Sequence, residues 1–165
     1  MADHESIQKL AAAVVDALKR SSKAVATAES CTGGWLAKSI TDISGASAVF
    51  HYGIVSYSNG AKESMLGVQN QTLEQHGSVS EPVVREMAKG VLRLSGADIS
   101  VAVSGIAGPT GGSKEKPVGT VWFAWAMRDG SKVRVDAGTQ HFGGDRELVR
   151  ELTVVHALQG IMDRL

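Results

Sequence analysis

The spacing of apolar residues changes several times along the chain, from a helical pattern to an extended one and back. Ile7, Leu10, Val14 and Leu18 recur every three or four residues, which predicts an amphipathic helix over residues 5–20. The same reasoning, with turn and capping residues as boundaries, predicts further helices. They are expected at residues 34–41, 61–66, 72–76 and 80–95, and in a final helix that begins after Asp145 and buries Leu148, Leu152, Val155 and Met162.

Segments rich in β-branched and aromatic residues lie between these helices. The run from Ile99 to Val103 is almost entirely apolar, as in a central strand covered on both faces. Asp129-Gly130 predicts a hairpin between the last two strands. Helices mixed with strands and one hairpin indicate an α/β fold, namely a three-layer α/β/α single domain over residues 1–165 with a mixed β-sheet. The strands are expected at residues 24–28, 49–58, 99–103, 118–127 and 132–141.

Composition and charge narrow the class of protein. With 43% hydrophobic residues among 165, the chain can bury a core without a disulfide or a metal. Its 17 basic and 17 acidic residues cancel, which argues against a general nucleic-acid binder. The single cysteine, Cys31, fits a reducing compartment. Because the acidic N-terminus, residues 1–5, does not resemble a signal peptide and no apolar stretch is long enough to span a membrane, we expect a cytoplasmic protein.

The first candidate for chemistry is the turn between the first expected strand and the helix after it. Its residues, TAESCTGG at 27–34, are mostly small, and N–H groups at a helix start can bind phosphate or stabilise an oxyanion. Ser30 lies where an acyl-transfer nucleophile would be useful, provided that a base takes its proton. Cys31 is an alternative nucleophile, and Ser30 or Thr32 as a plain helix cap is an equally weighted interpretation. The candidate substrate contacts in this turn are Thr32, Gly33 and Gly34.

A second candidate lies at the end of the strand over residues 49–58. Tyr57 is near the strand end, and Lys62 follows in the first turn of the next helix, after the turn signal Asn59-Gly60. A lysine can serve as the base for a serine when burial or a neighbouring cation lowers its pKa. A solvated surface lysine and a tyrosine that only packs are the more common arrangements.

The third candidate is a glycine- and proline-rich loop over residues 104–117, which is long for a connection in a compact domain. It contains neither a Walker A pattern nor G-x-G-x-x-G, yet its N–H groups and hydroxyls could hold an anion. Arg146, which follows the expected helix cap, could reach a phosphate with its planar guanidinium. A flexible surface loop and a helix-surface arginine are the alternatives. The candidate substrate-binding residues of the loop are Ser104, Gly105, Gly108, Thr110, Gly111 and Gly112.

Metal chemistry has no support in the sequence. The five histidines form no H-x-x-x-H or H-x-E pattern, and there is no second cysteine. We therefore expect neither a structural nor a catalytic metal site.

Together these motifs resemble the CinA C-terminal domain family. The resemblance covers nearly the whole chain, and its long glycine-rich segment is specific, whereas the short ones would mean little alone. It implies a three-layer α/β/α fold and hydrolysis of the carboxamide of nicotinamide mononucleotide to nicotinic acid mononucleotide and ammonia, without a cofactor. The matching segments are TAESCTGG at 27–34, GASAVFHYGIVSYSNGAK at 45–62, HGSVSEPVV at 76–84, SGIAGPTGGSKEKPVGTVWFA at 104–124 and FGGDRELVR at 142–150.

The resemblance also implies roles for individual residues. Ser30 matches the presumed nucleophile of the family, and Lys62 and Tyr57 match positions thought to assist it. Arg146 and the loop at 104–113 match positions suited to nucleotide contacts. Larger family members carry an N-terminal domain that this sequence lacks, so no pyrophosphatase activity is expected. Alanine at position 46 stands where the family commonly has a second serine, and this affects no implied role.

Two other functions stay open at this point. A paralogue could keep the nucleotide pocket and do no chemistry, because function lies in the site rather than the fold. The joint presence of Ser30, Tyr57, Lys62 and Arg146 favours the enzyme. A purely structural partner of a larger protein gains no support from the neutral charge. The expected partners are the small-molecule substrate and a second copy of the chain in a dimer, as in many small α/β enzymes, with no nucleic acid and no membrane.

Overall fold

One five-stranded sheet forms the centre of the computed structural model, which describes residues 4–165. Its strands are β1 (Val25–Glu29), β2 (Phe50–Val55), β3 (Ile99–Gly105), β4 (Thr120–Asp129) and β5 (Lys132–His141). They lie in the order β2-β1-β3-β4-β5. β1 runs parallel to both of its neighbours, whereas β4 runs antiparallel to both β3 and β5. The first three residues of the acidic N-terminus lie outside the described part.

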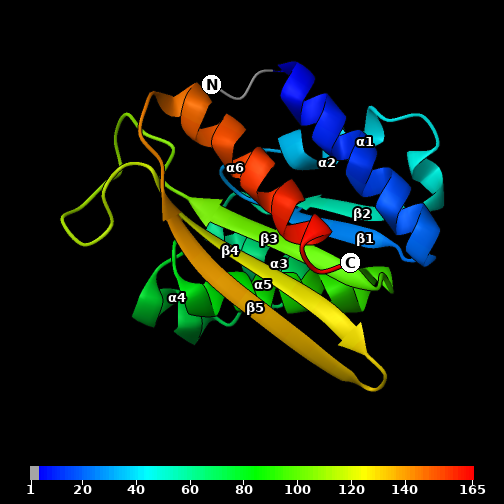
Figure 1. Ribbon diagram of the computed structural model, residues 1–165. Helices are drawn as coiled ribbons and strands as arrows, with labels where there is room; N and C mark the ends of the chain where they lie inside the picture. Colours follow the sequence, from blue (N-terminus) through cyan, green and yellow to red (C-terminus); the bar gives the residue numbers. More distant parts are fainter. Residues whose placement is uncertain (1–3) are drawn as a thin grey trace.

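Helices cover both faces of this sheet, so the domain has three layers (Figure 1). One face carries α1 (His4–Ser21), α2 (Trp35–Thr41) and α6 (Arg146–Met162), and the other carries α3 (Asn59–Leu66), α4 (Asn70–His76) and α5 (Glu81–Ser95). A short 3-10 helix, Ala46–Ala48, precedes β2. Successive side chains of β3 alternate between the two cores, because a strand presents its residues to opposite faces.

The architecture confirms the expected α/β/α fold with a mixed sheet, and the element boundaries differ slightly for identifiable reasons. β2 ends at Val55 because Ser58 already caps α3, its hydroxyl accepting the N–H of Ala61. α2 begins at Trp35 because Gly34 has a φ of 100°, in the left-handed region. No helix within residues 4–165 is both long and apolar enough to cross a membrane.

The parallel strands bring three loops to one edge of the sheet. β1 ends at Glu29, β2 at Val55 and β3 at Gly105, and Glu29 pairs with Val55 on one side and with Val103 on the other. Residues that follow the carboxyl ends of neighbouring parallel strands lie close together, and α/β folds gather their sites there. The first three candidate segments of the sequence each follow one of these strands, and they therefore meet at one edge.

Gly90 marks a close approach between α3 and α5. A Cβ at this position would lie 2.0 Å from the backbone oxygen of Leu66, far inside van der Waals contact. We expect Gly90→Ala to push the helices apart and to lower the free energy of unfolding by roughly 1–3 kcal/mol, despite the better helix propensity of alanine. Urea unfolding measures this loss. Gly138→Ala is the control, because a Cβ there meets nothing within 4 Å; equal losses in the two variants would contradict the packing.

Candidate active site

The structure brings Ser30 and Lys62 into direct contact. The Nζ of Lys62 lies 2.9 Å from the Oγ of Ser30, although the residues are 32 positions apart in sequence. Ser30 follows β1, and its N–H donates to the carbonyl of Val103 on β3 at 3.1 Å. Lys62 lies on α3, beyond the cap at Ser58. The sheet therefore positions the serine, and a capped helix positions the lysine.

Lys62 is buried to a degree that is rare for a lysine, with 1% of the residue exposed. Its Nζ donates to the backbone carbonyls of Ser56 at 2.8 Å and Tyr57 at 3.1 Å. Within residues 4–165 no carboxylate forms an ion pair with it. Burial without a counter-ion disfavours the ammonium and lowers the pKa of Lys62 from its ordinary value of 10.5 to about 8. The amine can therefore be neutral near physiological pH.

A neutral amine in this position has the geometry of a general base. It keeps two N–H donors and gains one lone pair. The carbonyls of Ser56 and Tyr57 accept the two N–H bonds, which leaves the lone pair for the hydroxyl of Ser30. The contacts that orient the lysine are thus the ones that aim its lone pair at a serine, as in serine–lysine hydrolases.

Cys31, the alternative nucleophile, is buried next to Ser30. Its burial, and after that the negative charge of Glu29, raise the pKa of the thiol from 9.0 to about 11. Such a thiol carries almost no thiolate at neutral pH. The helix start does not activate Cys31, and Ser30 is the better equipped of the two.

A buried carboxylate organises the turn that carries Ser30. Glu29 is fully buried, and its Oε1 accepts the hydroxyl of Thr32 at 2.6 Å and the N–H of Leu36 at 2.8 Å. Its Oε2 accepts the N–H of Ala37 at 3.0 Å. These bonds satisfy the first turn of α2, which Gly34 in the cap position cannot do because it has no side chain. Glu29, rather than Ser30 or Thr32, therefore caps this helix.

An arginine of α6 holds the same turn from its other side. The Nε of Arg150 donates to the carbonyl of Cys31 at 3.0 Å, and its Nη2 donates to the carbonyl of Thr32 at 3.1 Å. Its guanidinium carbon lies 5.5 Å from the centre of the Trp35 ring. Contacts from β3, α2 and α6 together determine where the turn lies.

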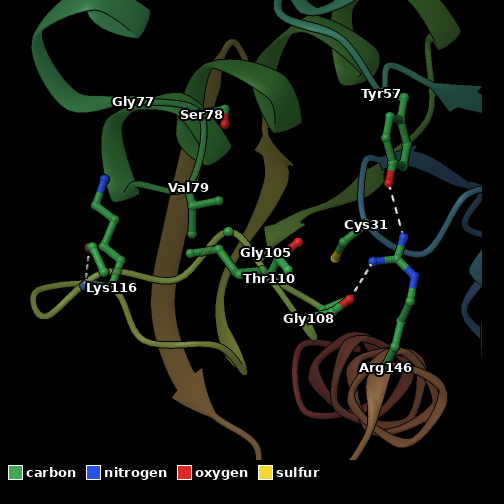
Figure 2. A pocket seen from close by; sticks show the side chains of 14 residues that line it. Cys31, Tyr57, Gly77, Ser78, Val79, Gly105, Gly108, Thr110, Lys116 and Arg146 are labelled. Atoms are coloured by element: carbon green, nitrogen blue, oxygen red, sulfur yellow. Dashed lines mark hydrogen bonds between the residues drawn. The ribbon is translucent and has the colours of Figure 1, made fainter.

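A cavity of about 410 Å³ is lined by Cys31, which follows Ser30 in the chain, and by Tyr57, whose carbonyl accepts from Lys62; Ser30 and Lys62 themselves are not part of its lining. It is lined by residues of the loops that follow β1, β2 and β3, as Figure 2 shows. Among the described residues its lining includes two cations, Lys116 and Arg146, and no carboxylate. Such a lining suits an anionic ligand. The predicted residues that line it are Tyr57, Gly105, Gly108, Thr110, Gly111 and Arg146.

Arg146 connects two sides of this cavity. Its Nη1 donates to the carbonyl of Gly108 at 2.7 Å, and its Nη2 donates to the hydroxyl of Tyr57 at 3.2 Å (Figure 2). The Tyr57 hydroxyl thus contacts Arg146, and the residue contributes its backbone carbonyl to Lys62. Because Lys62 reaches Ser30 directly, proton transfer between them needs no relay through the phenol.

Three predicted substrate contacts lie elsewhere. Thr32, Gly33 and Gly34 line a separate hollow of about 520 Å³, together with Trp35 and other residues. The N–H of Gly33 donates to the carbonyl of Ser30 at 3.1 Å, inside the turn. That N–H is therefore not available to a ligand.

Two further predicted residues support the glycine-rich loop from behind the lining. Ser104 is buried and donates its hydroxyl to the carbonyl of Ser78 at 2.8 Å. At Gly112 a Cβ would lie 2.6 Å from the backbone nitrogen of Val118. Both residues shape the loop, and neither belongs to the lining of the cavity.

Sequence reasoning missed one wall of the cavity. Gly77, Ser78 and Val79, between α4 and α5, line it, and so does Lys116. The sequence predicts a helix start only at residue 80, whereas the segment that matches the family begins at residue 76, and that match is the signal of a further role. Lys116 lies in the matching segment 104–124, which is its signal. Within residues 4–165 no group of three or more His, Cys, Asp or Glu side chains could hold a metal ion.

A serine in contact with a buried lysine, beside a cationic cavity at the carboxyl edge of parallel strands, has the chemistry that a hydrolase with a serine nucleophile requires. Residues 7–165 match the CinA C-terminal domain family, and the chain belongs to that family. This confirms the resemblance carried by the motifs.

Relatives and solved structures agree with this membership. The chain is 55% identical over 159 residues to nicotinamide-nucleotide amidohydrolase PncC of Escherichia coli (strain K12), a match that covers 96% of this chain and 94% of the relative. It is 57% identical over 153 residues to the protein of the same name from Enterobacter agglomerans, covering 93% and 92%. The crystal structure of a competence-damaged protein (CinA) superfamily protein from Escherichia coli matches with a TM-score of 0.92 and 37% identity, covering 100% of this chain and 94% of the other.

The carboxylate of Glu29 offers a test of how the turn is held. Glu29→Gln keeps the size of the side chain but replaces one acceptor oxygen with an amide donor, so a buried N–H or O–H loses its partner. We expect the free energy of unfolding, measured in urea, to fall by about 1–3 kcal/mol. Glu147→Gln, on the exposed first turn of α6, is the matched control. A loss no larger than in that control would contradict the role of Glu29.

Proposed function

We propose that this protein hydrolyses the carboxamide of nicotinamide mononucleotide, with nicotinic acid mononucleotide and ammonia as products. The contact of 2.9 Å between the Ser30 Oγ and the Lys62 Nζ carries the proposal, because it pairs a nucleophile with an amine that can be neutral. The substrate is inferred from two relatives that are more than half identical to this chain and are named nicotinamide-nucleotide amidohydrolase. The cationic lining of the cavity suits the phosphate of such a substrate.

The first half of the reaction forms an ester on Ser30. Neutral Lys62 takes the proton of the hydroxyl while the Oγ attacks the carboxamide carbon. When the tetrahedral intermediate collapses, the C–N bond breaks and the Lys62 ammonium gives its proton to the departing nitrogen. Ammonia leaves, and Lys62 is neutral again.

The second half consumes one water molecule. Lys62 takes a proton from the water as its oxygen attacks the ester carbon, and the proton passes to the Ser30 Oγ when the ester bond breaks. The product is the carboxylic acid, which ionises in water. The balance is one water consumed and one ammonia released, with the side chains unchanged and with no metal or redox cofactor in any step.

The oxyanion formed in both halves has to be held by N–H donors of the turn after Ser30. Gly33 uses its N–H inside the turn, and Thr32 and Gly34 line the separate hollow rather than the cavity. We assign the oxyanion to the backbone N–H of Cys31, the residue of this turn that lines the cavity. Removing one such donor costs about 2.7–4 kcal/mol of transition-state stabilisation in a serine hydrolase.

The rest of the nucleotide supplies binding energy that positions the amide. The contacts proposed for it are those of the cavity lining. They include Gly105, Gly108, Thr110, Gly111 and Arg146. Tyr57 orients Arg146 through its hydroxyl at 3.2 Å.

A homodimer and a cytoplasmic location complete the proposal. β2 is an edge strand of the sheet, and its Tyr52 and Val55 are 48% and 43% exposed. Open strand edges with exposed apolar side chains favour pairing with another chain. A second copy joined along β2 would lie close to the loop that carries Tyr57.

Ammonia release from nicotinamide mononucleotide by EDTA-treated protein tests the nucleophile. We expect Ser30→Ala to lose roughly a thousandfold or more of the wild-type rate, because removing the nucleophile leaves only the remaining binding contacts. Cys31→Ala is expected to lose far less. Near-normal turnover by Ser30→Ala would contradict the mechanism, and a wild-type protein that binds the nucleotide without releasing ammonia would indicate a paralogue that only binds.

The pKa of Lys62 predicts the pH profile. Only the neutral amine accepts a proton, and its pKa is lowered to about 8. We therefore expect kcat/KM to rise about tenfold per pH unit below that pKa and to level off above it. Measurement from about pH 6 to about pH 10 covers both limbs. Lys62→Arg, with a guanidinium that stays charged, should be inactive throughout; a flat wild-type profile would rule out Lys62 as the base.

A further inference from the structure

The two cations of the cavity lie on opposite sides of it. In Figure 2 Arg146 is close to Tyr57 and to Cys31, which follows Ser30 in the chain, whereas Lys116 lies across the cavity beside Gly77. Within residues 4–165 neither cation forms an ion pair with a carboxylate. Both charges are therefore open to an anionic ligand, and the geometry distinguishes the two.

Arg146 forms its hydrogen bonds on the side of the cavity that carries Tyr57. Its guanidinium donates to the carbonyl of Gly108 at 2.7 Å and to the hydroxyl of Tyr57 at 3.2 Å. The backbone carbonyl of Tyr57 in turn accepts from the Nζ of Lys62 at 3.1 Å. A phosphate bound at this end would stabilise the Lys62 ammonium, which opposes the use of that amine as a base.

Lys116 is anchored but not neutralised. Its Nζ donates to the backbone carbonyl of His76 at 2.6 Å, and the residue is only partly exposed. A carbonyl is a neutral acceptor, so the ammonium keeps its charge and two further N–H donors. Its backbone N–H donates to the Ser113 Oγ at 3.1 Å, and the Ser113 N–H donates back to its carbonyl at 2.8 Å. These bonds close the loop into a turn with a cation and a hydroxyl on the cavity lining.

We propose that Lys116 binds the phosphate of the nucleotide, with the hydroxyls of Ser113 and Thr110 as further donors. The assignment rests on the proposed function, because the identity of the substrate comes from it. With the phosphate held on the Lys116 side of the cavity, the nicotinamide ring at the other end of the nucleotide would lie on the side of Cys31, which follows Ser30 in the chain, and of Tyr57, whose carbonyl accepts from Lys62. The preference for a nucleotide over a nucleoside then depends on a single charge.

Nicotinamide riboside lacks the phosphate, so comparing it with nicotinamide mononucleotide isolates this contact. Lys116→Met keeps the apolar stem and removes the charge. We expect kcat/KM for the nucleotide to fall by about 10- to 100-fold, mainly through KM. For the riboside it should stay within about twofold of wild type. If Lys116 only held the loop at His76, Lys116→Met would lower kcat/KM for both substrates alike.

Lys114 provides the matched control, since it lies in the same loop but is exposed and outside the lining. Lys114→Met is expected to leave kcat/KM unchanged for both substrates. Lys116→Arg is expected to retain part of the preference for the nucleotide. Equal losses on both substrates in Lys116→Met would overturn the assignment. A preference lost in Arg146→Met instead, or a wild-type enzyme that treats both substrates alike, would overturn it as well.

A titration separates this inference from the proposed function. Ribose 5-phosphate carries the phosphate without the amide, so its affinity by isothermal titration calorimetry does not depend on turnover. We expect Lys116→Met to weaken it by about tenfold or more and Lys114→Met to leave it unchanged. If the wild type released no ammonia from nicotinamide mononucleotide, the proposed function would fail. The titration would still show whether Lys116 binds the phosphate. Equal affinities in the three proteins, or no binding by the wild type, would overturn the role of Lys116.

Discussion

An amine buried without a counter-ion is the constraint on which the site depends. Lys62 keeps its place through three neutral oxygen atoms, two from backbone carbonyls and one from a hydroxyl. A carboxylate in their place would hold the lysine charged and remove its basicity. The fold therefore has to exclude water and acidic groups together, and the closely packed layers on both faces of the sheet provide that exclusion.

The opposite charges of the site are used differently. Glu29 and Arg150 lie on either side of the turn after β1, and each forms hydrogen bonds that hold the turn in place. Lys116 and Arg146 line the cavity and have only neutral partners. One pair of charged residues thus gives the site its shape, and the other gives it a positive potential.

The fold could be predicted because its signals are local. The helical periodicity of α1, the apolar run of β3 and the Asp129-Gly130 hairpin each act over a few residues, and all three were confirmed. The stripe expected to be buried in the last helix was wrong, because α6 turns another face to the core: it buries Val149, Val154, Ala157, Leu158 and Ile161, whereas Leu148, Leu152, Val155 and Met162 are only half-buried. Ser30 and Lys62 could be proposed together because parallel strands bring their ends to one edge. Their direct contact and the depression of the lysine pKa depend on burial, which is a property of the whole fold.

The sequence could not predict where the N–H groups of the turn point, or which distant segments pack together around the cavity. A helix start presents N–H groups, but the sequence does not say that a buried Glu29 takes two of them or that Thr32 to Gly34 face another hollow. The wall at Gly77 to Val79 comes into place only when α4 and α5 pack beside the glycine-rich loop. Such contacts join segments far apart in sequence, so no local sequence pattern predicts them.

The distance along the chain between Ser30 and α6 has a consequence for biosynthesis. Arg150 reaches back 119 positions to the carbonyl of Cys31. A ribosome delivers the N-terminal part of a domain first, so the serine and its lysine emerge long before the arginine that holds their turn. A growing chain therefore carries the reactive side chains without a finished site. The turn that carries Ser30 is complete only when α6 packs against it, so the active site forms only after the whole chain has been synthesised.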